Sequence, residues 1–109
     1  MALITRAEEF FLLAVWRLQN NAYAVTIREQ LKQATGKEWA FGALFVSLDR
    51  LEKKGLLESH LSEPTPERGG RSKRMYQVTP AGLQALAEVK RAEKAMWAGL
   101  PEIPAPSVR

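Results

Sequence analysis

Apolar residues recur at helical spacing near the start of the chain. Residues 5–19 predict a helix, with Thr5 and Glu8 at the spacing of a capping box. One apolar stripe of this helix consists of Ala7, Phe10, Phe11, Ala14 and Leu18. Four further apolar residues fall outside the stripe, namely Leu12, Leu13, Val15 and Trp16. A helix that is apolar nearly all round is buried on more than one side, so it is either a central core helix or faces another subunit.

Two more helices are predicted in quick succession. The second begins between residues 23 and 26 and ends at Gly36, since glycine suits the position after a helix. Thr26 and Glu29 have the spacing of a second capping box. The third helix lies between Gly42 and Gly55, and its inner face consists of Leu44, Leu48 and Leu51. Two helices joined by a short connection form a helix-turn-helix.

The second half of the chain predicts a hairpin and then a long helix. Residues 56–61 and 74–78 are expected to be strands, joined by a loop over 62–70 that is rich in proline and glycine. Thr79 and Pro80 suit the start of a helix that ends near residue 98. Its apolar residues are Leu83, Leu86, Ala87, Val89, Met96 and Trp97. The fold class predicted is α+β, mostly α: a winged helix-turn-helix.

Length and composition narrow the class of protein further. A chain of 109 residues with 46% hydrophobic content is expected to form one folded domain. It has no apolar run long enough to span a membrane, and no basic segment precedes an apolar one at its start, so we expect neither a membrane partner nor a signal peptide. Cysteine is absent, which fits a reducing compartment and predicts a cytoplasmic protein.

The residues that could carry catalysis are few. His60 is the only histidine, and without a second histidine or a cysteine it has no partners for metal binding or nucleophilic catalysis. The glycines Gly69 and Gly70 loosely resemble a phosphate-binding loop, but they lie in a hairpin rather than before a helix. The sequence therefore predicts no enzyme, no metal site and no cofactor.

Positive charge gathers at the predicted hairpin tip. The net charge is +4, and four cations stand close together beside Gly69 and Gly70: Arg68, Arg71, Lys73 and Arg74. Glycines let a backbone approach phosphates or enter a minor groove. This block favours contact with duplex DNA, although a charged tip can also simply keep an edge strand soluble.

The outer face of the third helix is the second candidate for DNA contact. With its leucines turned inward, the outward residues are Ala43, Val46, Ser47, Arg50 and Lys54. An α-helix fits the major groove, where small residues allow close approach and Arg50 can reach a guanine or a phosphate. The alternative is a core helix with a solvated cationic end.

The chain resembles the PadR family of bacterial transcriptional regulators from about Phe11 to Leu86. The most specific matches are the segments GALF-VS-LDRLEKKGLLE over 42–58 and ERGGRSKRMYQVTPAG over 67–82. The resemblance implies a homodimeric repressor whose two recognition helices enter successive major grooves of a palindromic operator. It departs from the family at residues 43–46, where the family commonly has Thr-Leu-Tyr-Pro. Phe45 stands at the place of the tyrosine and is a further candidate for DNA contact. It lacks the tyrosine hydroxyl, which could form a hydrogen bond with a phosphate.

The resemblance also implies where two copies meet. Family members dimerise through the first and last helices, so residues 80–98 are expected to be a dimerisation helix that follows a DNA-binding domain over 1–79. The prolines of residues 99–109 predict a mobile tail. The candidate interface residues are Phe11, Leu12, Val15, Trp16, Leu86, Val89, Met96 and Trp97. Of these, Trp16, Met96 and Trp97 could stack on a small aromatic or apolar effector, or could simply pack in the interface. The alternative from another class is a protein–protein adaptor without DNA binding.

Overall fold

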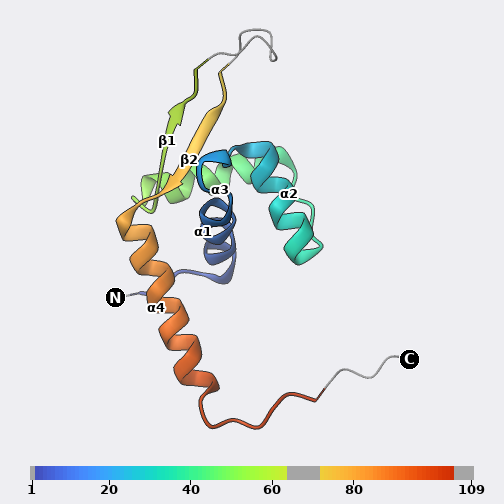
Figure 1. Cartoon of the computed structure of the whole chain (residues 1–109), viewed down its shortest axis with the longest axis vertical. Helices are drawn as coiled ribbons and strands as arrows, with labels where there is room; N and C mark the ends of the chain where they lie inside the picture. The colour runs from blue at the N-terminus through green and yellow to red at the C-terminus, as the bar shows by residue number, and fades with distance from the viewer. Residues whose placement is uncertain (1, 64–71, 105–109) are drawn as a thin grey trace, which may run out of the picture.

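Three short helices, a two-stranded hairpin and a long final helix make up the described part of the chain (Figure 1). The computed structural model describes residues 2–63 and 72–104. In chain order the elements are α1 (Arg6–Leu18), η1 (Gln19–Asn21), α2 (Ala24–Thr35), α3 (Phe41–Lys53), β1 (Leu57–Leu61), β2 (Arg74–Val78) and α4 (Pro80–Trp97). The predicted fold class, α+β and mostly α, is confirmed.

Side-chain caps fix where the helices begin. At α1 the amide N–H of Glu8 donates to Thr5 Oγ1 at 3.1 Å, and Thr5 N–H donates to Glu8 Oε1 at 2.8 Å, which confirms the first capping box. The second was predicted wrongly, because α2 begins two residues before Thr26. Thr26 instead lies in the first turn, where its Oγ1 accepts the N–H of Tyr23 at 3.0 Å.

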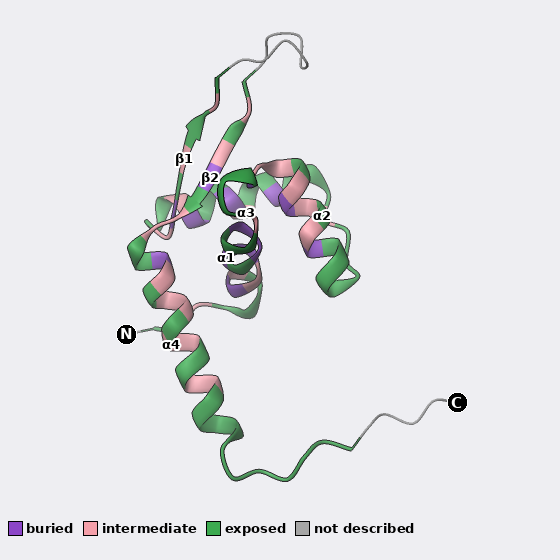
Figure 2. Cartoon of the chain, viewed as in Figure 1, coloured by how far each residue is buried: buried purple, intermediate pink, exposed green. Residues whose placement is uncertain are grey.

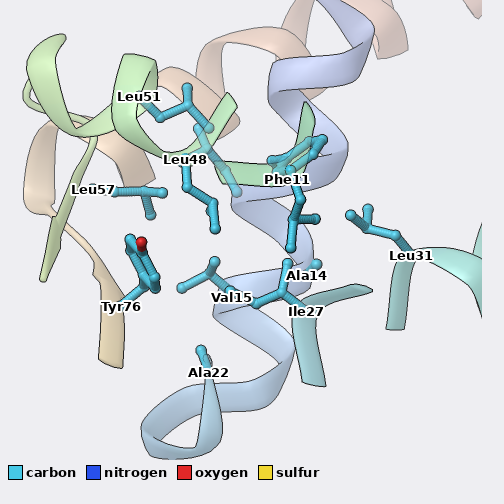
Figure 3. Packing of buried hydrophobic residues seen from close by; sticks show 12 residues of the cluster. Phe11, Ala14, Val15, Ala22, Ile27, Leu31, Leu48, Leu51, Leu57 and Tyr76 are labelled. Atoms are coloured by element: carbon cyan, nitrogen blue, oxygen red, sulfur yellow. The ribbon is translucent and has the colours of Figure 1, made fainter. Parts of the chain in front are cut away.

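The core is built around α1, which packs against α2, α3, β2 and α4 (Figure 3). Phe11, Leu12 and Val15 of α1 are at most 1% exposed. The predicted inner face of α3 is confirmed, since its three leucines are equally buried. The other large side chains of this core are Ile27, Leu31, Leu57 and Tyr76. The expectation of a central core helix is therefore correct for Phe11, Leu12 and Val15 of α1.

The hairpin is attached to the core at its base and projects away from the helices (Figure 1). Its strands are antiparallel, with Leu57 opposite Val78 and Leu61 opposite Arg74. Leu57 and Tyr76 are buried, and the N–H of Tyr76 donates to the carbonyl of Ala22 at 2.8 Å. Leu61, at the outer end, is 62% exposed. The core therefore holds the base of the hairpin, whereas the outer end of β1 is exposed.

The final helix, α4, packs against α1 and β2 near its start and extends away from the other helices (Figure 1). Its start is fixed by Thr79, whose Oγ1 accepts the N–H of Gly82 at 3.0 Å and donates to the carbonyl of Gly55 at 2.6 Å. Its last turns are exposed in the single chain (Figure 2). Within residues 2–63 and 72–104, none of the helices combines the length and apolar character needed to cross a membrane.

Candidate nucleic-acid interface

The outward face of α3 is apolar over its first two turns. Phe41, Phe45 and Val46 are 40%, 48% and 57% exposed, and Gly42 and Ala43 beside them are exposed as well. The rings of Phe41 and Phe45 lie near each other, with their centroids 6.4 Å apart. Large apolar side chains gathered on one exposed helix face are a common feature of surfaces that bind partners.

Arg28 of α2 holds the start of α3 in place. Its Nε donates to the carbonyl of Trp39 at 2.5 Å, and its guanidinium lies 4.6 Å from the centroid of the Phe41 ring. Glu38 also lies within 3.5 Å of the Arg28 guanidinium. These contacts join α2 to the connection that precedes α3, so the two helices present the exposed face as a fixed unit.

Two of the predicted residues of α3 lie on the side of the helix that faces α1. Ser47 and Arg50 lie toward the start of α1, where they line a shallow pocket of about 140 Å³ with Thr5 and Glu8. Ser47 is half-buried, whereas Arg50 is exposed and forms no ion pair within the described residues. Among the described residues, Arg50 is therefore the cation of α3 without an ion-pair partner.

Lys54 is engaged within the chain. Its ammonium group forms an ion pair with Glu8 of α1, which joins the end of α3 to the central helix. Burial of Glu8 raises the pKa of its carboxyl group, but the hydrogen bonds from Lys54 and Thr5 lower it more, so the net pKa lies below the ordinary value of 4.5. A phosphate contact by Lys54 would require exchange of this partner.

Phe45 faces the hairpin. Together with Asp49, Lys53 and Arg74 it lines a cleft of about 650 Å³ between α3 and β2. Asp49 and Lys53 form an ion pair of 3.0 Å across one turn of the helix. Sequence reasoning missed Asp49, although it falls on the outward side of the same helical pattern that gave Val46.

The two described cations of the hairpin tip have neighbours within the chain. The ammonium group of Lys73 lies 3.5 Å from the centroid of the Tyr23 ring. Arg74 Nη1 donates to Ser59 Oγ at 2.9 Å, and Ser59 Oγ donates in turn to Glu52 Oε2 at 2.8 Å. The other predicted tip residues, Arg68, Gly69, Gly70 and Arg71, lie outside the described residues.

A second surface is the groove between α1 and α4. It has a volume of about 710 Å³, and its apolar lining consists of Leu13, Trp16, Leu83, Leu86, Ala87 and Trp97. Arg6 joins the two helices beside it by pairing with Glu9 of α1 at 3.0 Å and with Glu93 of α4 at 3.3 Å. Trp16 and Trp97, both predicted to meet an effector or a second copy, lie in this one groove.

Several predicted interface residues lie elsewhere. Phe11, Leu12 and Val15 are buried in the core of their own chain and have no surface to offer a second copy, which corrects their assignment to an interface. Val89 is half-buried, and Met96 is 76% exposed but does not line the groove. Leu13 and Leu83 were missed. Leu13 was recognisable as an apolar residue outside the main stripe of its helix.

His60 was the one histidine weighed for catalysis or metal binding. His60 is exposed on β1 opposite Met75, and within 2–63 and 72–104 no three acidic, histidine or cysteine residues gather as metal ligands. A helix-turn-helix followed by a hairpin, with an exposed face on the second helix of the pair, defines the winged helix-turn-helix class.

Comparison with known proteins identifies the family within this class. Residues 12–88 match the model of the transcriptional regulator PadR-like family, so the chain belongs to that family. Regulators of this family bind DNA and are not enzymes. The match ends at residue 88, whereas α4 continues to Trp97. No sequence among curated proteins matches the chain.

Solved structures agree with the family assignment. A PadR-like transcription factor from Bacteroides fragilis is 28% identical, with a TM-score of 0.67 over 83% of this chain and 82% of that one. RosR of H. salinarum is 22% identical, with a TM-score of 0.70 over 90% of this chain and 81% of that one. A PadR family regulator from Eggerthella lenta is 24% identical, with a TM-score of 0.65 over 86% and 79%. The latter two show likeness of fold.

Proposed function

We propose that this PadR-family regulator is a cytoplasmic, homodimeric repressor that binds a palindromic operator. The observation that carries the proposal is the exposed face of α3, held on the core by three buried leucines and continuous with the base of the hairpin through a common cleft. An α-helix presented in this way fits the major groove, and the adjoining hairpin can follow the backbone of the same duplex.

The groove between α1 and α4 supports the homodimer. Leu13, Trp16 and Trp97 are at least 36% exposed in the single chain and lie on its walls. A second copy would cover these side chains, and two copies related by a twofold axis bind two half-sites of a palindrome. In this proposal Leu13 and Leu83 take the place of the three core residues of α1.

The repressor would act by occupying a promoter, and a small aromatic or apolar molecule bound in the same groove would release it. Trp16 and Trp97 supply flat apolar surfaces for such a molecule. Because the groove would also be the dimer interface, the molecule would act by changing how the two copies pair.

Fluorescence anisotropy tests the proposal with duplex DNA from the region upstream of the protein's own coding sequence. We expect saturable binding that weakens steeply with salt, by a logarithmic slope of about −0.9 for each phosphate neutralised. A scrambled duplex of the same composition is the control. Equal binding to both duplexes, or no binding at low salt, would contradict the proposal and favour a winged-helix adaptor that contacts proteins.

A further inference from the structure

The first six residues of α3 have no side chain that can form a hydrogen bond. Residues 41–46 read Phe-Gly-Ala-Leu-Phe-Val, and Leu44 among them is buried in the core. In recognition helices these N-terminal turns usually reach the base edges. The side chains of residues 41–46 therefore cannot read bases through hydrogen bonds.

The nearest polar side chains of α3 do not replace them. Ser47 is half-buried beside α1, and Asp49 is paired with Lys53 at 3.0 Å. Arg50 is exposed, but it lies in the last turn of α3, on the side that faces the start of α1, so a base that it reads is not one opposite residues 41–46. The most exposed large side chain on the outward face is Val46, at 57%, and Phe45 follows at 48%.

The major groove has one apolar group on its base edges, the C5-methyl group of thymine. Val46 and Phe45 are suited to contact it. Valine is branched at Cβ and stiff at χ1, so it presents its methyl groups at little cost in conformational entropy. The Phe45 ring is flanked by Phe41, which lies under the Arg28 guanidinium at 4.6 Å from the ring centroid.

We infer that Val46 and Phe45 recognise thymine methyl groups, so that each operator half-site carries A·T pairs opposite the start of α3. This inference rests on the proposed function, because it names the DNA that the proposed repressor prefers. It attributes part of the DNA sequence preference to residues 43–46, where the chain departs from the common family pattern.

Selection from a random duplex library tests the proposed function and the thymine inference separately. If no sequence is enriched, the proposed function fails. If sequences are enriched with G·C pairs at every position that responds to substitution of Val46, the proposed function stands and the thymine inference is overturned. Enrichment of A·T pairs at those positions is the expected result.

Deoxyuridine then tests the methyl group itself, because it differs from thymidine only by lacking that group. Replacing each contacted thymine should weaken binding about fourfold, the ratio that corresponds to about 0.8 kcal/mol for one buried methylene-sized group. Binding that is unchanged by deoxyuridine would overturn the inference. As a complement, 5-methylcytosine at the same position should bind more tightly than cytosine.

Variants connect the effect to the two side chains. In Val46→Ala and Phe45→Ala, we expect weaker binding to the selected site and a smaller difference between thymine and deoxyuridine. Val25→Ala is the matched control, since Val25 is 56% exposed and lies on α2 rather than on α3. The melting temperature of each variant verifies folding, and an undiminished deoxyuridine effect in both α3 variants would overturn the assignment.

Discussion

Gly82 of α4 lies directly against the carbonyl oxygen of Leu56. A Cβ atom on residue 82 would stand 2.7 Å from Cγ1 of Val78 and closer still to that oxygen. This close approach joins the start of α4 to the chain segment that enters β1. The glycine is required by space, because its backbone has an ordinary helical conformation.

Gly82→Ala should therefore destabilise the fold by about 1–3 kcal/mol, the usual range for overpacking a tight contact. Gly42→Ala is the matched control, because Gly42 is exposed in α3 and a Cβ added there would have open space within 4 Å. That control should stabilise the protein by about 0.5–1 kcal/mol, since alanine is the better helix former. Urea unfolding measures both. A change of the same sign in the two variants would contradict the packing argument.

Glu8 should contribute to stability in a manner that depends on pH. Its folded pKa lies below the ordinary value of 4.5, because the hydrogen bonds from Lys54 and Thr5 outweigh the effect of burial. A lowered folded pKa means that the contribution is present above about pH 4.5 and is lost as the pH falls through the folded pKa. Glu8→Gln should therefore lower the melting temperature at pH 7 and reduce its dependence on pH in the acid range.

The control for Glu8 is the same substitution at Glu58, an exposed carboxylate on β1. Melting curves between about pH 3 and pH 7 cover the range in which carboxyl groups titrate. If Glu8→Gln and Glu58→Gln give the same acid profile, the pair between Glu8 and Lys54 does not stabilise the fold as described.

Two substitutions on α1 should separate dimerisation from folding. Trp16→Ala removes a groove side chain that is 44% exposed, so we expect a shift toward monomer with little loss of monomer stability. Leu12→Ala removes a side chain that is 0% exposed, and it should destabilise the fold by about 2–5 kcal/mol. Light scattering and urea unfolding measure the two effects.

A chain that ends at Val89 tests the contribution of the last turns of α4. It lacks Trp97, which lines one wall of the groove. We expect it to remain folded and to be monomeric. A stable dimer of this shortened chain would contradict the proposed role of the end of α4.

Arg50 and Arg71 should affect DNA binding in different ways. Arg50→Ala is expected to lower affinity for the selected site more than for random DNA, because a base-edge contact contributes about 1–3 kcal/mol of discrimination. Arg71→Ala, a change at the predicted hairpin tip, should weaken all sequences alike and reduce the salt slope by about one. Equal losses on both DNAs in both variants would contradict this division of roles.

The sequence predicts the elements well because their signals are local. Thr5 with Glu8, Gly36 after α2, and Thr79 with Pro80 each act within one helical turn, and the structure has helix ends at these places. The inner face of α3 follows from the spacing of three leucines alone. Thr26 was assigned to the wrong position because the cap residue of α2 is Tyr23, and Thr26 accepts the Tyr23 N–H from within the first turn.

The candidate surfaces depended on tertiary packing, which the pattern of a single helix does not contain. On α1 nearly every side is apolar, so the pattern did not distinguish buried Leu12 from exposed Leu13. That distinction arises because α2, α3, β2 and α4 all pack around this helix. Likewise, the ion pair between Glu8 and Lys54 joins two helices that are far apart in the sequence.

The internal partners of the cations affect how a salt titration of this protein is interpreted. If Lys54 exchanged Glu8 for a phosphate, the DNA would release a cation, but the vacated carboxylate would attract one from solution. Lys53 and Asp49 would undergo the same exchange. The net number of ions released would then be smaller than the number of phosphates contacted. A shallow slope can therefore accompany an extensive interface, and the slope measures the cations that are unpaired in the free protein.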